Sequence, residues 1–229
     1  MWIFAFSIFG IVQGTFAEVD CSTEPFLERD RPKLLSYIPQ EISEYNRLCP
    51  KVPAFLRCLK EFQDECAGMA HIFESQEYYD GIYGAFSDLC EKGTLFNTVA
   101  IEHLRCFNET FTKTSCPEKM KAITGPYRTV EKSTVDEYEY SLPIEIMCLQ
   151  DILESSCIAA EIGRNCGQVA LEATLEFLRR TFYVEEICGT KSAEYLLTNL
   201  DEFTLDKEQR ELVIATLGNI IIARGKDTM

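Results

Sequence analysis

Apolar residues recur at every third or fourth position through much of the chain, with polar and charged residues between them. The clearest series is Leu171, Leu175, Leu178 and Phe182, and comparable series run through residues 72–89 and 96–107. Such spacing places the apolar side chains on one face of an α-helix, whereas half-buried strands alternate strictly. The pattern predicts an all-α fold with about eight helices, little or no sheet, and a last amphipathic helix within residues 205–223.

Eight of the cysteines form two quartets with similar spacing. Successive separations are 9, 8 and 24 in the first quartet, and 9, 9 and 22 in the second. The quartets are Cys49, Cys58, Cys66 and Cys90, and Cys148, Cys157, Cys166 and Cys188. In each, a long amphipathic helix is expected to end at the fourth cysteine, over residues 81–90 and 176–188. The spacing favours two related helical units: residues 18–142, of which 117–142 form a linker, and residues 143–229.

The first 17 residues have the properties of a secretory signal peptide. An apolar run from Trp2 to Val12 is followed by Thr15 and Ala17, the small residues at the positions that signal peptidase requires. The run is far shorter than the roughly 20 apolar residues that span a bilayer. We therefore expect cleavage after Ala17, secretion to the extracellular space, and no membrane span in the mature chain.

All eleven cysteines lie beyond this segment, where an oxidising compartment favours disulfides. The chain has no C-x2-C pair, which disfavours a metal site. Cys58 and Cys66 would lie about 12 Å apart on one helix, so neighbouring cysteines must bridge to other helices. The disulfide candidates are Cys49, Cys58, Cys66, Cys90, Cys106, Cys116, Cys148, Cys157, Cys166 and Cys188. Six of these precede the second unit and four lie in it, so Cys21 is the odd cysteine: free, capped, or linking two chains as a disulfide-bonded dimer.

The chain carries a formal net charge of −15. An acidic excess of this size repels nucleic acid and anionic membrane surfaces, so neither is expected as a partner. The sequon Asn108-Glu109-Thr110 predicts N-glycosylation of Asn108, which would place that segment at the surface.

Residues with catalytic spacing are scarce. The two histidines, His71 and His103, belong to no H-E-x-x-H or G-x-S-x-G pattern. Glu102 and His103 lie close to Cys106, but an oxidised cysteine is no nucleophile. The sequence also lacks a phosphate-binding glycine loop and an EF-hand pattern, so we expect a non-enzymatic protein without a cofactor. A hydrolase or toxin-like enzyme would require one histidine to meet a carboxylate or hydroxyl in a cleft.

The chain contains 15 Phe and 10 Tyr, many of them on predicted helical faces. Those singled out are Tyr78, Tyr79, Tyr83, Phe86, Phe177, Phe182 and Tyr183. They fit an ordinary helical core, which is the favoured interpretation, or the lining of an apolar pocket. The acidic stretch 136–140 is predicted to be a solvated linker; tyrosine sulfation or docking of a basic partner is the alternative.

Several segments between Tyr45 and Cys188 resemble the secreted 27 kDa haemolymph glycoproteins of insects. The similarity involves residues 45–62, 88–93 and 102–106, and then Cys148, Cys157 and Cys166 leading into 175–180 and Cys188. Cys21 and the extension after Cys188 depart from it. The resemblance implies a cysteine-rich arthropod protein of body fluid or a related secretion, with no established catalytic activity and no binding residues to transfer.

These observations lead to two functional hypotheses. The first is a secreted, non-enzymatic protein of body fluid or of a secreted material, acting through surface interactions with an extracellular partner and having a dry core. The alternative is an extracellular carrier of lipid or another small apolar molecule, in which the singled-out aromatic residues line a continuous pocket.

Overall fold

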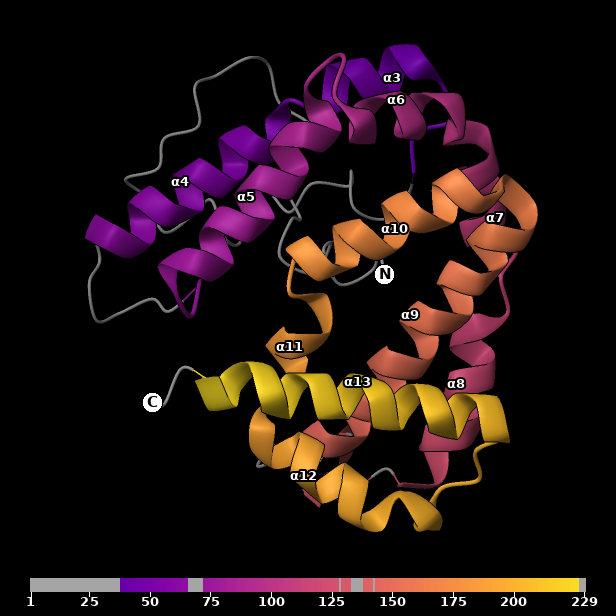
Figure 1. Cartoon of the computed structure of the whole chain (residues 1–229). Helices are drawn as coiled ribbons and strands as arrows, with labels where there is room; N and C mark the ends of the chain where they lie inside the picture. Colours follow the sequence, from indigo (N-terminus) through magenta and orange to yellow (C-terminus); the bar gives the residue numbers. More distant parts are fainter. Residues whose placement is uncertain (1–37, 66–71, 128, 133–137, 142, 227–229) are drawn as a thin grey trace. The chain divides into compact units, whose positions relative to one another are not determined.

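The computed structural model describes residues 38–65, 72–127, 129–132, 138–141 and 143–226, and most of them are helical (Figure 1). The α-helices are α3 (Ile42–Leu48), α4 (Lys51–Glu65), α5 (Gln76–Cys90), α6 (Leu95–Glu102), α7 (Leu104–Lys113), α8 (Cys116–Thr124), α9 (Ile144–Cys166), α10 (Gln168–Arg180), α11 (Tyr183–Ile187), α12 (Thr190–Asn199) and α13 (Lys207–Lys226). The predicted all-α, disulfide-crosslinked fold is confirmed. The proposed signal peptide, Cys21, Cys66 and His71 lie outside the described residues.

Part of the predicted linker has regular structure. It contains α8 and the 3₁₀ turn Gly125–Tyr127, and then strands β1 (Thr129–Lys132) and β2 (Tyr138–Ser141). The strands pair antiparallel, with Val130 opposite Tyr140. Residues 133–137 lie outside the described part of the chain. Of the acidic stretch 136–140, the structure therefore describes only residues 138–140, which belong to β2.

The chain divides into two compact units, each with its own core, but not at the predicted boundary. Unit 1 comprises Met1–Lys113 and Ala159–Phe182, and unit 2 comprises Thr114–Ile158 and Tyr183–Met229. The predicted units were residues 18–142 and 143–229. The difference arises because α10 packs against α5 and α6 of unit 1, while α8 and the first part of α9 supply residues to the core of unit 2.

In unit 1, Gly81 of α5 packs tightly against the C-terminal end of α10. A Cβ atom on Gly81 would lie 2.5 Å from the carbonyl oxygen of Arg180 and 2.6 Å from the ring of Phe182, so only glycine fits. Phe182 itself has a φ of 48°, in the left-handed region that bulky residues rarely adopt. The predicted helix over residues 176–188 is therefore wrong as one element: it is broken between α10 and α11.

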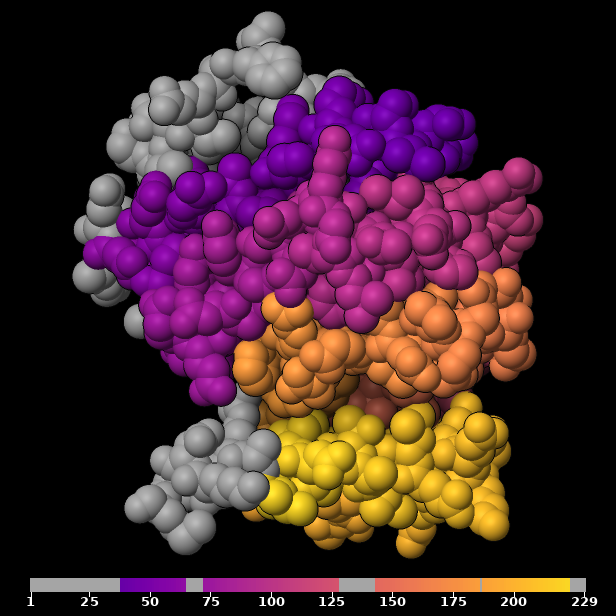
Figure 2. Space-filling view, turned by 45° about the horizontal axis from the view of Figure 1, so that its top comes forward, coloured from indigo at the N-terminus to yellow at the C-terminus, as the bar shows by residue number. Residues whose placement is uncertain are grey.

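The core of unit 2 is built by α8, α9, α12 and α13. Leu149, Leu196 and Leu217, from three of these helices, are fully buried. The hydroxyl of Tyr127 donates to the carbonyl oxygen of Glu202 at 2.5 Å, joining the 3₁₀ turns Gly125–Tyr127 and Leu200–Glu202. Helix α13 forms an outer layer of this unit (yellow in Figure 2) and packs against α12.

The disulfides follow the quartets only in part. Cys49–Cys90 and Cys148–Cys188 each join the first and fourth cysteines of a quartet, with separations of 41 and 40 residues. The other two bonds, Cys106–Cys166 and Cys116–Cys157, each join a cysteine before residue 143 to one after it, across the predicted boundary between the units. Cys58 is also disulfide-bonded. Contacts between distant helices, which spacing does not encode, decided these pairs.

Candidate functional site

An apolar cavity of about 50 Å³ lies within unit 1. Helices α3, α5, α6, α7 and α10 and the residues just before α3 surround it. Its lining consists of Ile38, Pro39, Tyr45, Leu89, Phe96, Val99, Ala100, Leu104, Phe107, Ala173, Thr174 and Phe177. Apolar side chains thus provide nearly all of the wall. They come from segments far apart in the sequence, from Ile38 to Phe177.

Helical periodicity explains how each segment contributes. Phe96, Val99 and Ala100 occupy positions i, i+3 and i+4 of α6, and Ala173, Thr174 and Phe177 occupy positions i, i+1 and i+4 of α10. The hydroxyl of Thr94 caps α6 by accepting from the backbone N–H of Asn97, which fixes where the helix begins. The rings of Phe96 and Phe177 meet edge to face, with centroids 6.1 Å apart.

The few polar groups at the cavity bond to the protein itself. The hydroxyl of Tyr45 donates to the carbonyl oxygen of Leu89 at 2.5 Å, and that of Thr174 donates to Ala170 at 2.8 Å. Burial raises the pKa of Tyr45 far above its usual value, an effect partly offset by a hydrogen bond with Asn97, so this residue remains neutral. A molecule in the cavity would meet apolar surface and polar groups that already have partners. Only an apolar group gains by entering.

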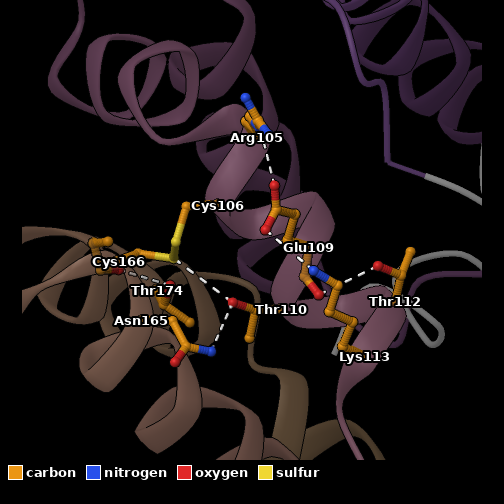
Figure 3. The surroundings of a disulfide bond; sticks show 10 residues. Arg105, Cys106, Glu109, Thr110, Thr112, Lys113, Asn165, Cys166 and Thr174 are labelled. Carbon is orange, nitrogen blue, oxygen red and sulfur yellow. Dashed lines mark hydrogen bonds and ion pairs between the residues drawn. A yellow bond between two sulfur atoms is a disulfide. The ribbon is translucent and has the colours of Figure 1, made fainter.

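Two disulfides hold the walls of the cavity together. Cys49–Cys90 joins the ends of α3 and α5, one turn after Tyr45 and directly after Leu89. Cys106–Cys166 joins α7, between Leu104 and Phe107, to the last residue of α9 (Figure 3). Because α10 begins two residues after Cys166, this bond ties the α7 and α10 walls to each other.

Polar contacts surround the second of these disulfides. Thr110, only 3% exposed, has its hydroxyl 3.8 Å from Sγ of Cys166 and accepts a hydrogen bond from Nδ2 of Asn165 at 3.2 Å. Along α7, Glu109 pairs with Arg105 at 2.8 Å and with Lys113 at 3.3 Å (Figure 3). These two cations hold the pKa of Glu109 below its usual value, the hydrogen bond from Arg105 being the largest single cause.

A larger hollow of about 380 Å³ shares Phe96, Val99 and Ala173 with the cavity. Its wall is more polar, since it includes Asp88, Glu172, Glu176 and Arg180. Arg180 contacts two other residues of this wall: its guanidinium lies 5.3 Å from the ring centroid of Phe96 and forms an ion pair with Asp88.

Most of the aromatic residues singled out in the sequence belong to the cores. Tyr78 and Phe86 are buried, and Tyr79, Tyr83 and Phe182 pack against the same core of unit 1, which confirms the core interpretation for them. Tyr183 is buried in unit 2. Only Phe177 of this set lines the cavity. Ile38, Tyr45 and Phe107 were missed as lining residues, although the helical spacing of 96–107 indicated a buried face.

The candidate catalytic residues do not form a site among the described residues. His103 lies at the C-terminal end of α6, half-buried, with its ring 6.3 Å from that of Phe107. Cys106 is oxidised, and so is every other cysteine in the described ranges, so none of them offers a thiolate to a substrate or a metal.

Asn108 is half-buried on α7 rather than fully exposed. Its Nδ2 atom, the atom that a glycan would modify, donates to the carbonyl oxygen of Ile38 at 2.6 Å. The threonine of the sequon, Thr110, is buried. Glycosylation of Asn108 remains a prediction, and a glycan on Nδ2 would compete with the hydrogen bond from this nitrogen to Ile38.

Unit 2 buries a carboxyl group that the sequence analysis did not single out. Asp151 is only 2% exposed, and its Oδ2 has no hydrogen-bond partner in the described part of the chain. Burial raises the pKa of Asp151 to about 7, and the negative charge of Glu154 adds to this effect. Tyr183 is also buried, and its pKa is raised mainly by burial and further by these two carboxylates.

No helix among the described residues combines the length and the apolar character needed to cross a membrane. Comparison of the chain with known protein families, with curated proteins and with solved structures finds no match. The resemblance to haemolymph glycoproteins therefore remains a prediction from the sequence.

Proposed function

We propose that the protein is a secreted, non-enzymatic carrier whose unit 1 binds a small apolar molecule. The observation that supports this most directly is the apolar cavity between two disulfides. Binding sites for small molecules are typically preformed and apolar, and crosslinked walls lower the entropy that binding must remove. The N-terminal sequence and the disulfides support secretion.

The size of the cavity restricts the ligand. Its volume of about 50 Å³ is roughly a third of the 150 Å³ of an apolar cavity that binds benzene. The occupant is thus a short apolar group of a few carbon atoms, or the end of a longer apolar molecule.

Charge restricts the ligand as well. The net charge of −15 and the satisfied polar groups of the lining disfavour an anion such as a fatty-acid carboxylate. We therefore propose a neutral apolar ligand, which distinguishes this carrier from one that is selective for fatty acids.

The test is titration of the purified protein with 1-pentanol and, as a matched anion, with pentanoate, followed through the amide resonances in nitrogen-15 NMR spectra. Pentanol should shift resonances of residues that line the cavity, and pentanoate should bind at least tenfold more weakly. Native mass spectrometry of the secreted protein would show a retained natural ligand as extra mass lost on denaturation.

Two variants locate the binding. Ala100→Leu fills the cavity and should abolish the pentanol shifts, whereas Ala54→Leu makes the same change at an exposed position of α4 and should leave them intact. Equal binding to both variants, or no binding to wild type, would contradict the carrier function and favour a protein that acts through its surface.

A further inference from the structure

The residues just before α3 form part of the wall of the cavity. Ile38 is 6% exposed and, with Pro39, forms part of the lining. The helical hydrogen bonds of α3 begin later, where the N–H of Tyr45 donates to Glu41. Pro39 has no N–H with which to bond to the walls. The short segment Ile38–Pro39 therefore lines the cavity without belonging to a helix; we refer to it as the cover segment.

A side chain from α7 holds the cover segment in place. Asn108 donates from Nδ2 to the carbonyl oxygen of Ile38 at 2.6 Å, across 70 positions of sequence. Asn108 lies one position after Phe107, which lines the cavity, and two after Cys106, which is disulfide-bonded. The donor is thus fixed to the rigid wall, whereas the acceptor belongs to the cover segment.

The same nitrogen is the acceptor of the predicted glycan. In N-glycosylation it forms a bond to the anomeric carbon of a sugar carried on a polyprenyl diphosphate; the amide loses one proton, and the diphosphate leaves with the electrons of the broken carbon–oxygen bond. Afterwards Nδ2 carries a bulky sugar at a half-buried position, 2.6 Å from the atom to which it must donate. The sugar and the closed cover segment compete for the same space.

We propose that Asn108 is a latch that controls access to the apolar cavity, and that N-glycosylation at this residue releases the latch. This regulatory role rests on the proposed carrier function. The unglycosylated protein holds the cover segment closed and exchanges ligand slowly, whereas the glycosylated protein exchanges it quickly. A single modification made during secretion thus sets the rate of loading and release.

The experiment compares four proteins: the glycosylated wild type from eukaryotic cells, the unglycosylated wild type from cells treated with a glycosylation inhibitor, and the variants Asn108→Asp and Thr112→Ala. Asn108→Asp keeps the shape of the side chain and removes both the donor and the glycan. Thr112→Ala keeps the sequon and is therefore also produced with the inhibitor; it is the control, because this exposed residue bonds to the backbone oxygen of Asn108 and lies outside the sequon. Asn108→Ala is a second donor-free variant in case the aspartate does not fold.

Two measurements are made on each protein. The first is the dissociation rate of 1-pentanol from NMR line shapes, which should rise about three- to tenfold in Asn108→Asp, as expected for one lost hydrogen bond. The second, made without ligand, is amide hydrogen exchange over residues 38–45, which should quicken by a similar factor. The glycosylated protein should behave like Asn108→Asp, and Thr112→Ala like the unglycosylated wild type.

The outcomes separate the two proposals. If no protein binds pentanol, the carrier function fails, and hydrogen exchange alone still decides whether Asn108 holds the cover segment. If pentanol binds but the donor-free variants exchange both ligand and amides at the unglycosylated wild-type rate, the latch is wrong and the carrier function stands. A glycosylated protein that exchanges as slowly as the unglycosylated one would overturn the role of the glycan.

Discussion

Nη1 of Arg180, at the end of α10, lies 2.6 Å from Oδ2 of Asp88, which is 92 positions earlier on α5. This ion pair joins two helices that the sequence analysis assigned to different units. Both side chains are partly exposed, at 28% and 41%, so solvent screens their attraction. The pair helps to align α10, which provides one wall of the cavity, with α5.

Breaking this ion pair should have a small, measurable effect. Arg180→Met and Asp88→Asn should each lower the free energy of unfolding by about 1 kcal/mol or less, with a coupling of roughly 0.5 kcal/mol between them. A double-mutant cycle in urea at low and high salt measures the coupling, which should fall with salt. Fully additive effects at both salt concentrations would show that the pair contributes nothing.

Two glycines of α5 should respond oppositely to alanine. Gly81→Ala places a Cβ atom against the backbone of Arg180 and should destabilise the protein by about 1–3 kcal/mol, the usual cost of overpacking. At Gly84 the nearest atom is Nη2 of Arg180 at 3.1 Å, the end of a flexible side chain, so alanine should be neutral or stabilise the helix by up to about 1 kcal/mol. Urea denaturation of both variants checks the contrast, which equal effects would refute.

The two disulfides formed by α7 and α8 should separate stability from binding. Removing Cys106–Cys166 or Cys116–Cys157 by paired Cys→Ser substitutions should cost about 4 kcal/mol in each case, because the closed loops of 60 and 41 residues have similar entropies. Only the first bond ties walls of the cavity, so only its loss should weaken pentanol binding in protein that remains folded. A comparable loss of binding in both variants would argue against a specific role.

Asp151 should make stability depend on pH. Its pKa is about 7 in the folded protein and near 4 when unfolded, so the folded state binds more protons between these values. The contribution is fully present below pH 4 and is lost as pH rises through 7, by roughly 4 kcal/mol at most for a shift of about three units. Asp151→Asn should flatten that part of the curve of unfolding free energy against pH. If the slope of this curve is unchanged in Asp151→Asn, other groups cause the pH dependence.

The sequence by itself determined the helical fold and the oxidised state of the cysteines. The spacing of Leu171, Leu175 and Leu178 specified a helix with one buried face, because side chains at i, i+4 and i+7 share a side of the 3.6-residue turn. The hydroxyl of Thr94 caps α6 through a bond to a backbone N–H only three residues away. Such features are local, so they can be predicted from neighbouring residues.

Only the tertiary structure decided which buried faces meet. The spacing of α10 shows that one face is apolar, but several partner helices would bury it equally well, and the sequence favoured a partner in the wrong unit. The pairing of Cys106 with Cys166, the contact of Asn108 with Ile38, and the cavity near both depend on contacts across 60 or more residues. Periodicity encodes the direction of burial along one helix, whereas a binding site depends on the relative placement of several, which is fixed by the packing of the whole unit.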